Sequence, residues 1–480
     1  MPKSLTSESA PGNSSVYRDL TVGIAGTFDV RNYGDLLFPL IASEALQRRD
    51  RRIQVVPFSV NGMSDPSWPF QVRNMEAMIA SISTLSAMLI GGGQIVRFDR
   101  SYPVPAPASV HLPFAYWLTP AVLAAFAGKP VIWNAVGVSM GWPHAPWYDE
   151  LVREVFAASY FIGVRDVVSR DDLARVAPGA DIQLLPDTAF SLSRLWPLQE
   201  ENTKSIEFTN WRRSLGLEGN YVVIQASAAV GKYRSIIESL LESMGGIPAV
   251  ILPICWCHGD RAEEFPELRG AASLCCEWLG PKLISEIIGR SQFVVASSLH
   301  ACITALSYGV PVARAPAWGR KFELLDEFEG IVQIDRKEAL SRLIHRGRRI
   351  EPRVIQYADR LDRYWDEVMD VVLQPSIEHC SLSTTLMLSW IARECGDRGR
   401  SGLTRRSVEA LRESLAGYFP YQRAALRHHL SHLKISAISA LRWTSHIRRR
   451  HIAGPKGVEM PPVQACGIGS TNLERGEDEC

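Results

Sequence analysis

The stretch Val294-Val-Ala-Ser-Ser-Leu-His300-Ala-Cys-Ile-Thr-Ala-Leu-Ser-Tyr-Gly309-Val-Pro-Val312 decides the fold. An apolar run ends in two serines and a histidine, a short helical segment follows, and a second apolar run begins after Gly-Val-Pro. This order predicts a strand, a loop, a helix and a second strand, as in a parallel sheet. His300 then lies at the carboxyl end of a strand, where open α/β sheets bind ligands.

Two interpretations of His300 stay open at this point. An imidazole titrates near neutral pH, so His300 is a candidate for proton exchange with a substrate. The histidine can equally make only structural hydrogen bonds in a loop that caps the following helix.

Short apolar runs alternate with helical segments along most of the chain. We expect further strands at 20–25, 53–58, 86–90, 130–136, 160–164, 181–185, 221–226 and 248–254. We expect helices at 36–48, 119–127, 148–158, 169–176, 235–244 and 281–289. This alternation predicts parallel sheets covered on both faces.

The polar stretch from Gln199 to Asn210 divides the alternation into two series and is the expected linker. We therefore predict an α/β protein with two Rossmann-like domains, residues 19–198 and residues 211–350, the second containing His300. Ligands favour the cleft between such domains.

The alternation stops near residue 353, and residues 353–451 are predicted to form a helical, basic extension. Between Arg398 and His451 there are twelve Arg or Lys and two Asp or Glu. The pattern is typical of helices on an anionic membrane surface, and equally of helices packed on the protein with a solvated basic face. Residues 1–18 are expected to be a disordered leader, and 452–480 a loose tail.

Composition excludes several classes of protein. The 480 residues carry a net charge of +1, so the whole chain has no bias toward nucleic acid, and we predict no such partner. Nine cysteines at irregular spacings do not suggest a disulfide framework. We find no secretory signal and no apolar run long enough to span a bilayer, so we predict a cytoplasmic protein.

Asn32-Tyr-Gly-Asp35 lies between the first strand and the first helix. Gly34 permits a close approach of the backbone, and Asp35 is a candidate helix cap. The amino terminus of a helix also favours anions such as phosphate or carboxylate. This loop matches neither a P-loop nor the Gly-x-Gly-x-x-Gly pattern.

Other motifs carry weaker signals. Gly91-Gly-Gly93 suggests a backbone that passes close to a ligand or to a second strand end. Arg165 follows a strand and is a candidate anion ligand, or a partner of Asp166 or Asp187. Gly137-Val-Ser-Met-Gly141 matches a nucleophile elbow, but the prolines after it disfavour the helix that an elbow requires.

Cys255, Cys257, His258, Cys275 and Cys276 invite a zinc hypothesis. The usual Cys-x-x-Cys spacing is absent, so buried cysteines of strands and helices are the preferred interpretation and no metal is predicted.

Taken in order, these motifs resemble the polysaccharide pyruvyl transferase family. The elements that match over residues 20–335 are Gly26, Asn32-Tyr-Gly-Asp35, Gly91–Gly93, Gly137–Gly141, Val164-Arg165-Asp166 with Ser169, Pro186-Asp187 with Phe190, Ser298-Leu-His300 with Ala305, and Gly309-Val-Pro311. The resemblance implies a fold similar to the two-domain GT-B glycosyltransferases, here with a C-terminal helical extension.

The implied activity is the transfer of pyruvate from phosphoenolpyruvate to a sugar of an exopolysaccharide or cell-envelope glycan precursor, which forms a ketal. The implied acceptor is a saccharide, either part of a polysaccharide or a lipid-linked precursor. With a lipid-linked acceptor, the basic C-terminal helices would dock the enzyme at the inner membrane face. In that family the residue that matches His300 acts at the donor site. Ketal formation needs proton transfer and anion binding but no metal, so no cofactor is predicted.

We predict His300 and Asp35 as the catalytic pair. The substrate-binding residues predicted with them are Asn32, Gly34, Gly92, Gly93, Arg165, Ser298, Arg320 and Lys321.

One departure leaves alternatives open. Many members of the family carry Arg-Leu-His where this chain has Ser298-Leu-His300. Serine supplies no charge for the donor anion, although Arg165, Arg314, Arg320 or Lys321 are candidates to compensate. The departure favours two alternatives, a GT-B glycosyltransferase that uses a nucleotide sugar, and a non-catalytic member that acts as a binding subunit. The sequence does not reveal the acceptor sugar or the oligomeric state.

Overall fold

A computed structural model of the chain describes residues 20–60, 62, 65–97, 113–139, 146–198, 204–269, 272–316 and 320–374. The predicted leader, the basic helices beyond residue 374 and the tail lie outside these ranges. Within them, no helix has the length and the apolar character that crossing a membrane requires.

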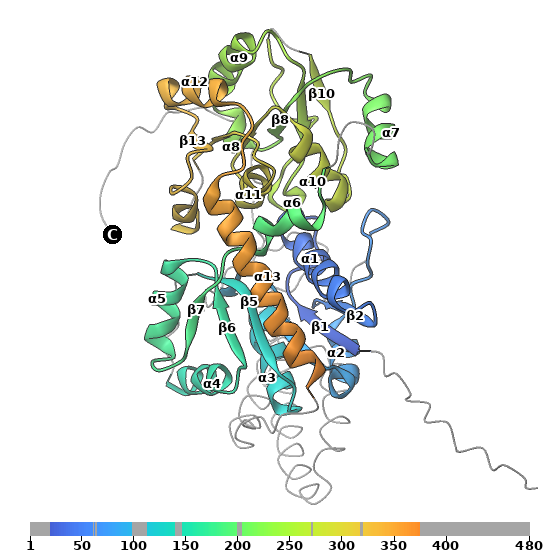
Figure 1. Cartoon of the computed structure of the whole chain (residues 1–480), viewed down its shortest axis with the longest axis vertical. Helices are drawn as coiled ribbons and strands as arrows, with labels where there is room; N and C mark the ends of the chain where they lie inside the picture. Colours follow the sequence, from blue (N-terminus) through green and yellow to red (C-terminus); the bar gives the residue numbers. More distant parts are fainter. Residues whose placement is uncertain are drawn as a thin grey trace, which may run out of the picture. The chain divides into compact units, whose positions relative to one another are not determined.

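The first sheet is parallel throughout, with strand order β2-β1-β3-β5-β6-β7, and β4 pairs with β5 beside this path (Figure 1). Its strands are β1 (Leu20–Ala25), β2 (Ile53–Phe58), β3 (Ala87–Ile90), β4 (Gly93–Arg97), β5 (Val131–Ser139), β6 (Phe161–Val164) and β7 (Ile182–Leu184). The six strands expected in this half are confirmed. β4 was not expected, because it begins inside the glycine run and is too short to show alternation.

Helices connect these strands. They are α1 (Tyr33–Arg49), α2 (Met75–Ser81), η1 (Ile82–Thr84), α3 (Pro113–Phe126), α4 (Pro146–Ala157), α5 (Val167–Val176), η2 (Thr188–Ser191) and α6 (Leu192–Leu195). Residues 20–198 are called the N-terminal half below.

The second sheet is also parallel, with order β10-β9-β8-β11-β12-β13. Its strands are β8 (Val222–Gln225), β9 (Ala249–Leu252), β10 (Ser273–Cys275), β11 (Phe293–Ala296), β12 (Val312–Arg314) and β13 (Ile331–Gln333). Two parallel α/β sheets confirm the predicted fold class.

Residues 204–351, called the C-terminal half, also contain α7 (Ile206–Ser214), α8 (Ala228–Gly231), α9 (Arg234–Ser243), η4 (Trp256–His258), α10 (Pro281–Arg290), α11 (Leu299–Ser307), η5 (Arg320–Leu325) and α12 (Lys337–Arg346). The expected linker is wrong at its end, because α7 begins at Ile206 and buries Phe208 and Trp211.

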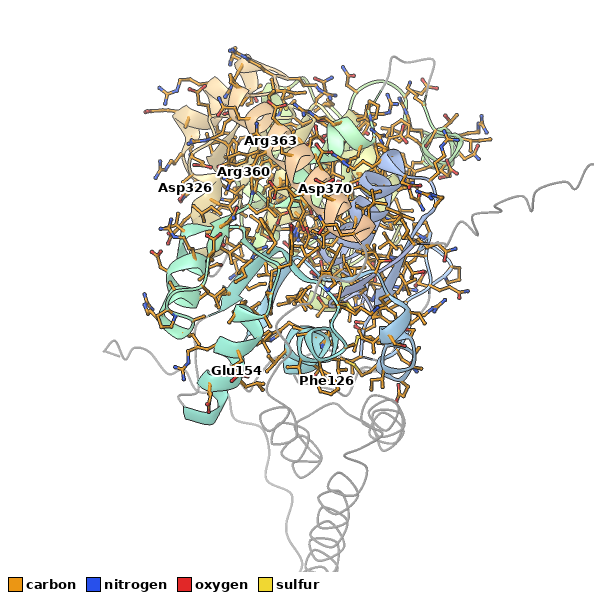
Figure 2. All side chains as sticks on the ribbon, turned by 60° about the horizontal axis from the view of Figure 1, so that its bottom comes forward. Phe126, Glu154, Asp326, Arg360, Arg363 and Asp370 are labelled. Carbon is orange, nitrogen blue, oxygen red and sulfur yellow. The ribbon has the colours of Figure 1, made fainter. Side chains whose placement is uncertain are left out.

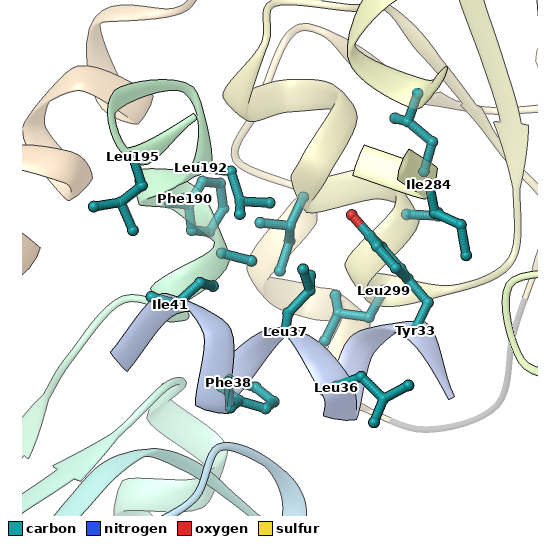
Figure 3. Packing of buried hydrophobic residues seen from close by; sticks show 14 of the residues in the cluster. Tyr33, Leu36, Leu37, Phe38, Ile41, Phe190, Leu192, Leu195, Ile284 and Leu299 are labelled. Atoms are coloured by element: carbon teal, nitrogen blue, oxygen red, sulfur yellow. The ribbon is translucent and has the colours of Figure 1, made fainter. Parts of the chain in front are cut away.

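The two halves share one apolar core. Helix α1 has apolar residues around most of its circumference, and its first thirteen or so positions are largely buried. Figure 3 shows α1 beneath residues of the C-terminal half, with Leu37 facing Leu299 and Tyr33 facing Ile284. The hydroxyl of Tyr33 lies 3.0 Å from Ser285 Oγ and 2.7 Å from Thr304 Oγ1, so a polar contact sits inside this apolar interface.

Helix α13 (Pro352–Leu373) crosses from the C-terminal half back to the N-terminal half (Figure 1). Its buried positions recur at helical spacing, whereas Arg360, Arg363 and Asp370 lie on its exposed face (Figure 2). Tyr364 donates a hydrogen bond to Asn134 Oδ1 at 3.0 Å, and Tyr357 packs on Phe190. The first part of the predicted helical extension is therefore an amphipathic helix, α13, and it belongs to the core.

Replacing Tyr33 by Phe is expected to lower the free energy of unfolding by about 1–3 kcal/mol, because Thr304 Oγ1 loses its partner inside the interface. Urea denaturation followed by circular dichroism measures the change. Tyr160→Phe, at a 45% exposed tyrosine, is the control and should change stability by less than about 0.5 kcal/mol. Equal values for the two variants would contradict a stabilising role for the Tyr33 hydroxyl.

Candidate active site

A cavity of about 500 Å³ lies where the carboxyl ends of strands from both sheets meet. It is lined by Thr27, Asn32, Asp35, Gln94, Ile95, Tyr116, Arg165, Gln225, Ser227, Ala228, Ala229, Cys255, His258, Asp260, Ser297, Ser298, Leu299, His300, Lys321 and Phe322. Open parallel sheets bind ligands at this edge, and here two such edges share one space. The structure thus brings together the predicted residues Asn32, Asp35, Arg165, Ser298, His300 and Lys321.

The amino terminus of α1 supplies Asn32 and Asp35. Asn32 is the helix cap, because its side chain accepts from the backbone N–H of Gly34 at 3.2 Å. The prediction that Asp35 caps the helix is wrong, since Asp35 already lies in the first turn. There it accepts a hydrogen bond from Asn32 Nδ2 at 2.8 Å, which holds the carboxylate at the cavity.

His300 lies in the first turn of α11 and packs against α1 from the other half. A Cβ atom on Gly34 would lie 2.0 Å from His300 Nδ1, so only glycine lets the imidazole approach this closely. The ring of Phe38 meets the imidazole edge-on, with centroids 5.4 Å apart. Gly92 in turn leaves room for Phe38, because a Cβ there would lie 1.9 Å from the Phe38 ring.

The predicted glycines therefore shape the site through packing. Gly34, Gly92 and Gly93 are absent from the described residues that line the cavity. Gly93 has a φ of +79°, and a Cβ there would lie 3.1 Å from Asp35 Oδ1. Each of the three makes room for a side chain of the site. Arg320 begins η5, beside Lys321, but its side chain lies outside what the structure describes.

Asp187 joins His300 to Arg165. Its Oδ2 lies 3.3 Å from His300 Nε2, without the alignment of a hydrogen bond, and 3.6 Å from Arg165 Nη1. Burial alone would raise the pKa of Asp187, but the charges of His300 and Arg165 outweigh it and hold this pKa below its usual range. Asp187 is consequently an ionised carboxylate beside Arg165 and His300. The sequence placed it after a strand but did not assign it to the site.

Arg165 is almost fully buried at the end of β6. It lies 3.6 Å from carboxylate oxygens of both Asp166 and Asp187, and it donates a hydrogen bond to Gln94. Its Nε has no hydrogen-bond partner among the described residues. A buried guanidinium with a donor to spare, in a cavity, suits the binding of a small anion.

The neighbouring motif residues are structural. Asp166 accepts from the backbone N–H of Ser169 and caps α5, and Ser169 accepts from the N–H of Val138. Arg314 is not among the described residues that line the cavity, and it donates hydrogen bonds to Phe322 O and to Asp326.

Asp35 has the opposite electrostatic character to Asp187. Burial raises its pKa above the usual range, although His300, a hydrogen bond with Thr27, His258 and Lys321 lower it in part. A carboxyl group with a raised pKa can hold a proton nearer neutral pH and deliver it to a substrate. Asp35 and Asp187 thus provide one carboxyl suited to proton transfer and one that stays charged.

Cys255 and Cys257 follow β9 and are half-buried, and Cys255 lines the cavity, whereas buried strand or helix positions were expected. Burial raises the pKa of both thiols, so they stay neutral at physiological pH. Among the residues that the structure covers, no group of three His, Cys, Asp or Glu side chains is placed to hold a metal ion.

Asp35→Asn is expected to gain stability relative to the native protein as pH rises above about 4. The raised pKa means that Asp35 favours folding at low pH and that this contribution is lost as pH rises through the folded pKa. An asparagine removes that loss and can still accept from Asn32. Urea denaturation at several pH values measures the difference.

Asp50→Asn is the control, for which the opposite change in stability is expected. Hydrogen bonds and the charge of Arg52 lower the pKa of Asp50 to about 2, so neutralising it should lower stability at neutral pH. If both variants respond to pH alike, the burial of Asp35 does not govern its titration.

Comparison with known proteins identifies the family. The family model described as polysaccharide pyruvyl transferase matches residues 32–314, more than half of the chain, and no curated protein matches. The chain is also similar to UDP-GlcNAc 2-epimerase from Neisseria meningitidis bound to UDP-GlcNAc, at 11% identity and a TM-score of 0.42, over 74% of this chain and 100% of that one. A glycosyltransferase from Rickettsia africae shows 12% identity and a TM-score of 0.40, over 83% and 99% of the two chains. The extent of the family match shows that this chain is a transferase that belongs to the polysaccharide pyruvyl transferase family.

Proposed function

We propose that the chain transfers pyruvate from phosphoenolpyruvate to two hydroxyl groups of a sugar, within a precursor of an exopolysaccharide or cell-envelope glycan. The observation that carries this proposal is the cavity shared by Asp35, His300 and Arg165. It offers two groups for proton transfer and one buried cation for a small anionic donor.

The reaction requires two bond-forming steps. One sugar hydroxyl adds to C2 of phosphoenolpyruvate while C3 gains a proton, which converts the methylene group to a methyl group. The second hydroxyl then bonds to C2, the bond from C2 to the phosphate oxygen breaks, and phosphate leaves. The two hydroxyl protons balance the proton gained by C3 and the proton taken up by the leaving phosphate.

We assign the proton transfers to His300 and Asp35. Asp35 has a raised pKa and lies on the N-terminal half, whereas His300 lies on the C-terminal half beside the ionised Asp187. A substrate held in the cavity would therefore meet one proton-transfer group from each half. Arg165 and Lys321 are the proposed ligands of the donor carboxylate and phosphate, with Ser298 and the amino terminus of α11 beside them.

The acceptor and the location of the enzyme remain proposals from the sequence. A lipid-linked acceptor would require contact with a membrane surface, and the basic segment that suits this contact lies outside the described residues. A cytoplasmic enzyme that meets its acceptor at the inner membrane face is the proposed arrangement.

His300→Ala is expected to lower the release of phosphate from phosphoenolpyruvate by about 100-fold or more, because general acid–base catalysis supplies a factor of that size. Purified protein would be incubated with phosphoenolpyruvate and an extract of lipid-linked oligosaccharides. His345→Ala, at a histidine on exposed α12, is the matched control and should keep full activity. Release that depends on the extract but not on His300 would refute the assigned role.

A second donor is favoured by one observation. Ser298 lines the cavity where many members of the family carry arginine, and its Oγ lies 4.0 Å from Cys255 Sγ. The diphosphate of a nucleotide sugar carries two negative charges, fewer than fully ionised phosphoenolpyruvate, so a site without this arginine favours it by comparison, and backbone donors can hold it. Nucleotide sugars are therefore the alternative donors to test.

Ser298→Arg is expected to lower the KM for phosphoenolpyruvate by about tenfold, since a charge-assisted hydrogen bond contributes about 1.5–3 kcal/mol. Steady-state kinetics of phosphate release measures the change. Ser298→Gln, of similar length without charge, is the control and should leave KM higher than in the arginine variant. An unchanged KM in both variants, with thermal stabilisation of the native protein by nucleotide sugars, would favour the second donor.

A further inference from the structure

Gln225 is a buried amide at the carboxyl end of β8, 3% exposed. Its Oε1 accepts the backbone N–H groups of Ser297 and Ser298, each at 2.8 Å. These two residues lead directly into α11, whose first turn carries His300. One side chain thus fixes the backbone at the point where the helix of the candidate acid/base residue begins.

The other end of the same amide binds Asp260. Gln225 Nε2 donates to Asp260 Oδ2 at 2.9 Å, and this oxygen also accepts the N–H groups of Ile254 at 3.0 Å and Cys255 at 2.8 Å. Asp260 is 2% exposed and lies at the end of the loop after β9. The carboxylate therefore folds this loop back onto β8.

The loop after β9 continues the connection to the N-terminal half. Ile254 O accepts the N–H of Tyr33 at 3.0 Å, and the N–H of Cys257 donates to Arg31 O at 3.3 Å. Asn32 and Cys255 form an antiparallel bridge between these two segments. Tyr33 is the first residue of α1, the helix that carries Asp35.

We infer that Gln225 and Asp260 are a positioning pair, which holds the amino termini of α11 and α1 at a fixed separation across the cavity. A continuous series of hydrogen bonds runs from the backbone before His300, through Gln225, Asp260 and the loop after β9, to the backbone before Asp35. The pair touches neither reacting group and acts through the backbone of two helices. Its importance for turnover rests on the proposed function, whereas the geometric link does not.

Gln225→Glu tests the pair with a change of one atom. The new carboxylate can still accept from Ser297 and Ser298, but it faces Asp260 Oδ2 with no proton between them. Burial already raises the pKa of Asp260, so one shared proton restores the contact at low pH. As pH rises, the two carboxylates repel each other and the link opens.

Other titratable and charged groups surround this pair. Cys255, Cys257 and His258 on the same loop and Arg261 after it interact electrostatically with Asp260 or with one another, and Asp35 interacts with the two cysteines and His258. These groups titrate in the native protein as well as in the variant, so comparing the two proteins at the same pH cancels the effect of these groups on exchange and turnover. Asp260→Asn keeps an oxygen acceptor at the same place without the charge.

Hydrogen–deuterium exchange of the full chain, without any substrate, measures the geometric link. In Gln225→Glu at pH 8, peptides over 293–302 and over 30–38 should both exchange about tenfold faster than in native protein, and the difference should shrink at pH 6. Turnover with phosphoenolpyruvate should fall by about 100-fold at pH 8, with little change in KM, and recover toward pH 6. Gln292→Glu is the control: the same substitution just before β11, at the end of the strand away from Ser297, should change neither the exchange rates nor the turnover.

Faster exchange confined to 293–302 would overturn the link, because Gln225 would then serve the C-terminal half alone. Equal exchange in native and variant protein would overturn it too. If Gln225→Glu does not fold, Asp260→Ala and Asp260→Asn replace it. The inference then requires that both segments exchange fast in Asp260→Ala. In Asp260→Asn, both segments should exchange at near-native rates. If the native protein shows no activity on phosphoenolpyruvate, the proposed function is contradicted. The exchange experiment uses no substrate, so it still tests the link between the two helices.

Discussion

The burial of helix α1 between the two halves is the constraint on which the structure depends. Leu37 and its apolar neighbours pack under the C-terminal half, and Gly34 lets the imidazole of His300 rest on the same helix. Each half alone would expose this apolar surface to water, at a cost of about 25 cal/mol for every Å². The hydrophobic core and the geometry of the candidate site therefore depend on the same helix, α1.

Charge is distributed across this interface in an ordered way. Arg165, Asp187 and His300 lie together with little access to water, and Asp187 Oδ2 is within 3.6 Å of both Arg165 Nη1 and His300 Nε2. Isolated burial of Arg165 or Asp187 would be unfavourable, because a low-dielectric surrounding penalises an unpaired charge. Burial raises the pKa of Asp35, and His300, His258 and Lys321 lower this pKa only in part. The pKa values of Asp35 and Asp187 thus shift in opposite directions because nearby positive charge outweighs burial only at Asp187.

Local sequence predicted most strands and helices, because buried parallel strands are short apolar runs between helices with helical periodicity. It also placed His300, Asp35 and Arg165 at strand ends. It missed β4 within the glycine run, and it mistook Asp35 for the cap that Asn32 provides. Asp187 was noted only as one element of the family resemblance and as a possible partner of Arg165, and Gln225 was not noted at all, because an isolated polar residue shows no periodicity. Their roles depend on partners that are distant in the sequence, such as Ser297, 72 residues from Gln225, which no local pattern reveals.

Helix α13 has a consequence for motion. The chain passes between the halves twice, once after α6 and again along α13, which contacts Phe190 near one end and Asn134 farther along. A single covalent crossing would leave the halves free to swing and twist about one point. Two crossings leave mainly one rotation, about the line that joins them, as a low-energy movement. The shared apolar core and the backbone hydrogen bonds between the start of α1 and the loop after β9 would resist even this rotation.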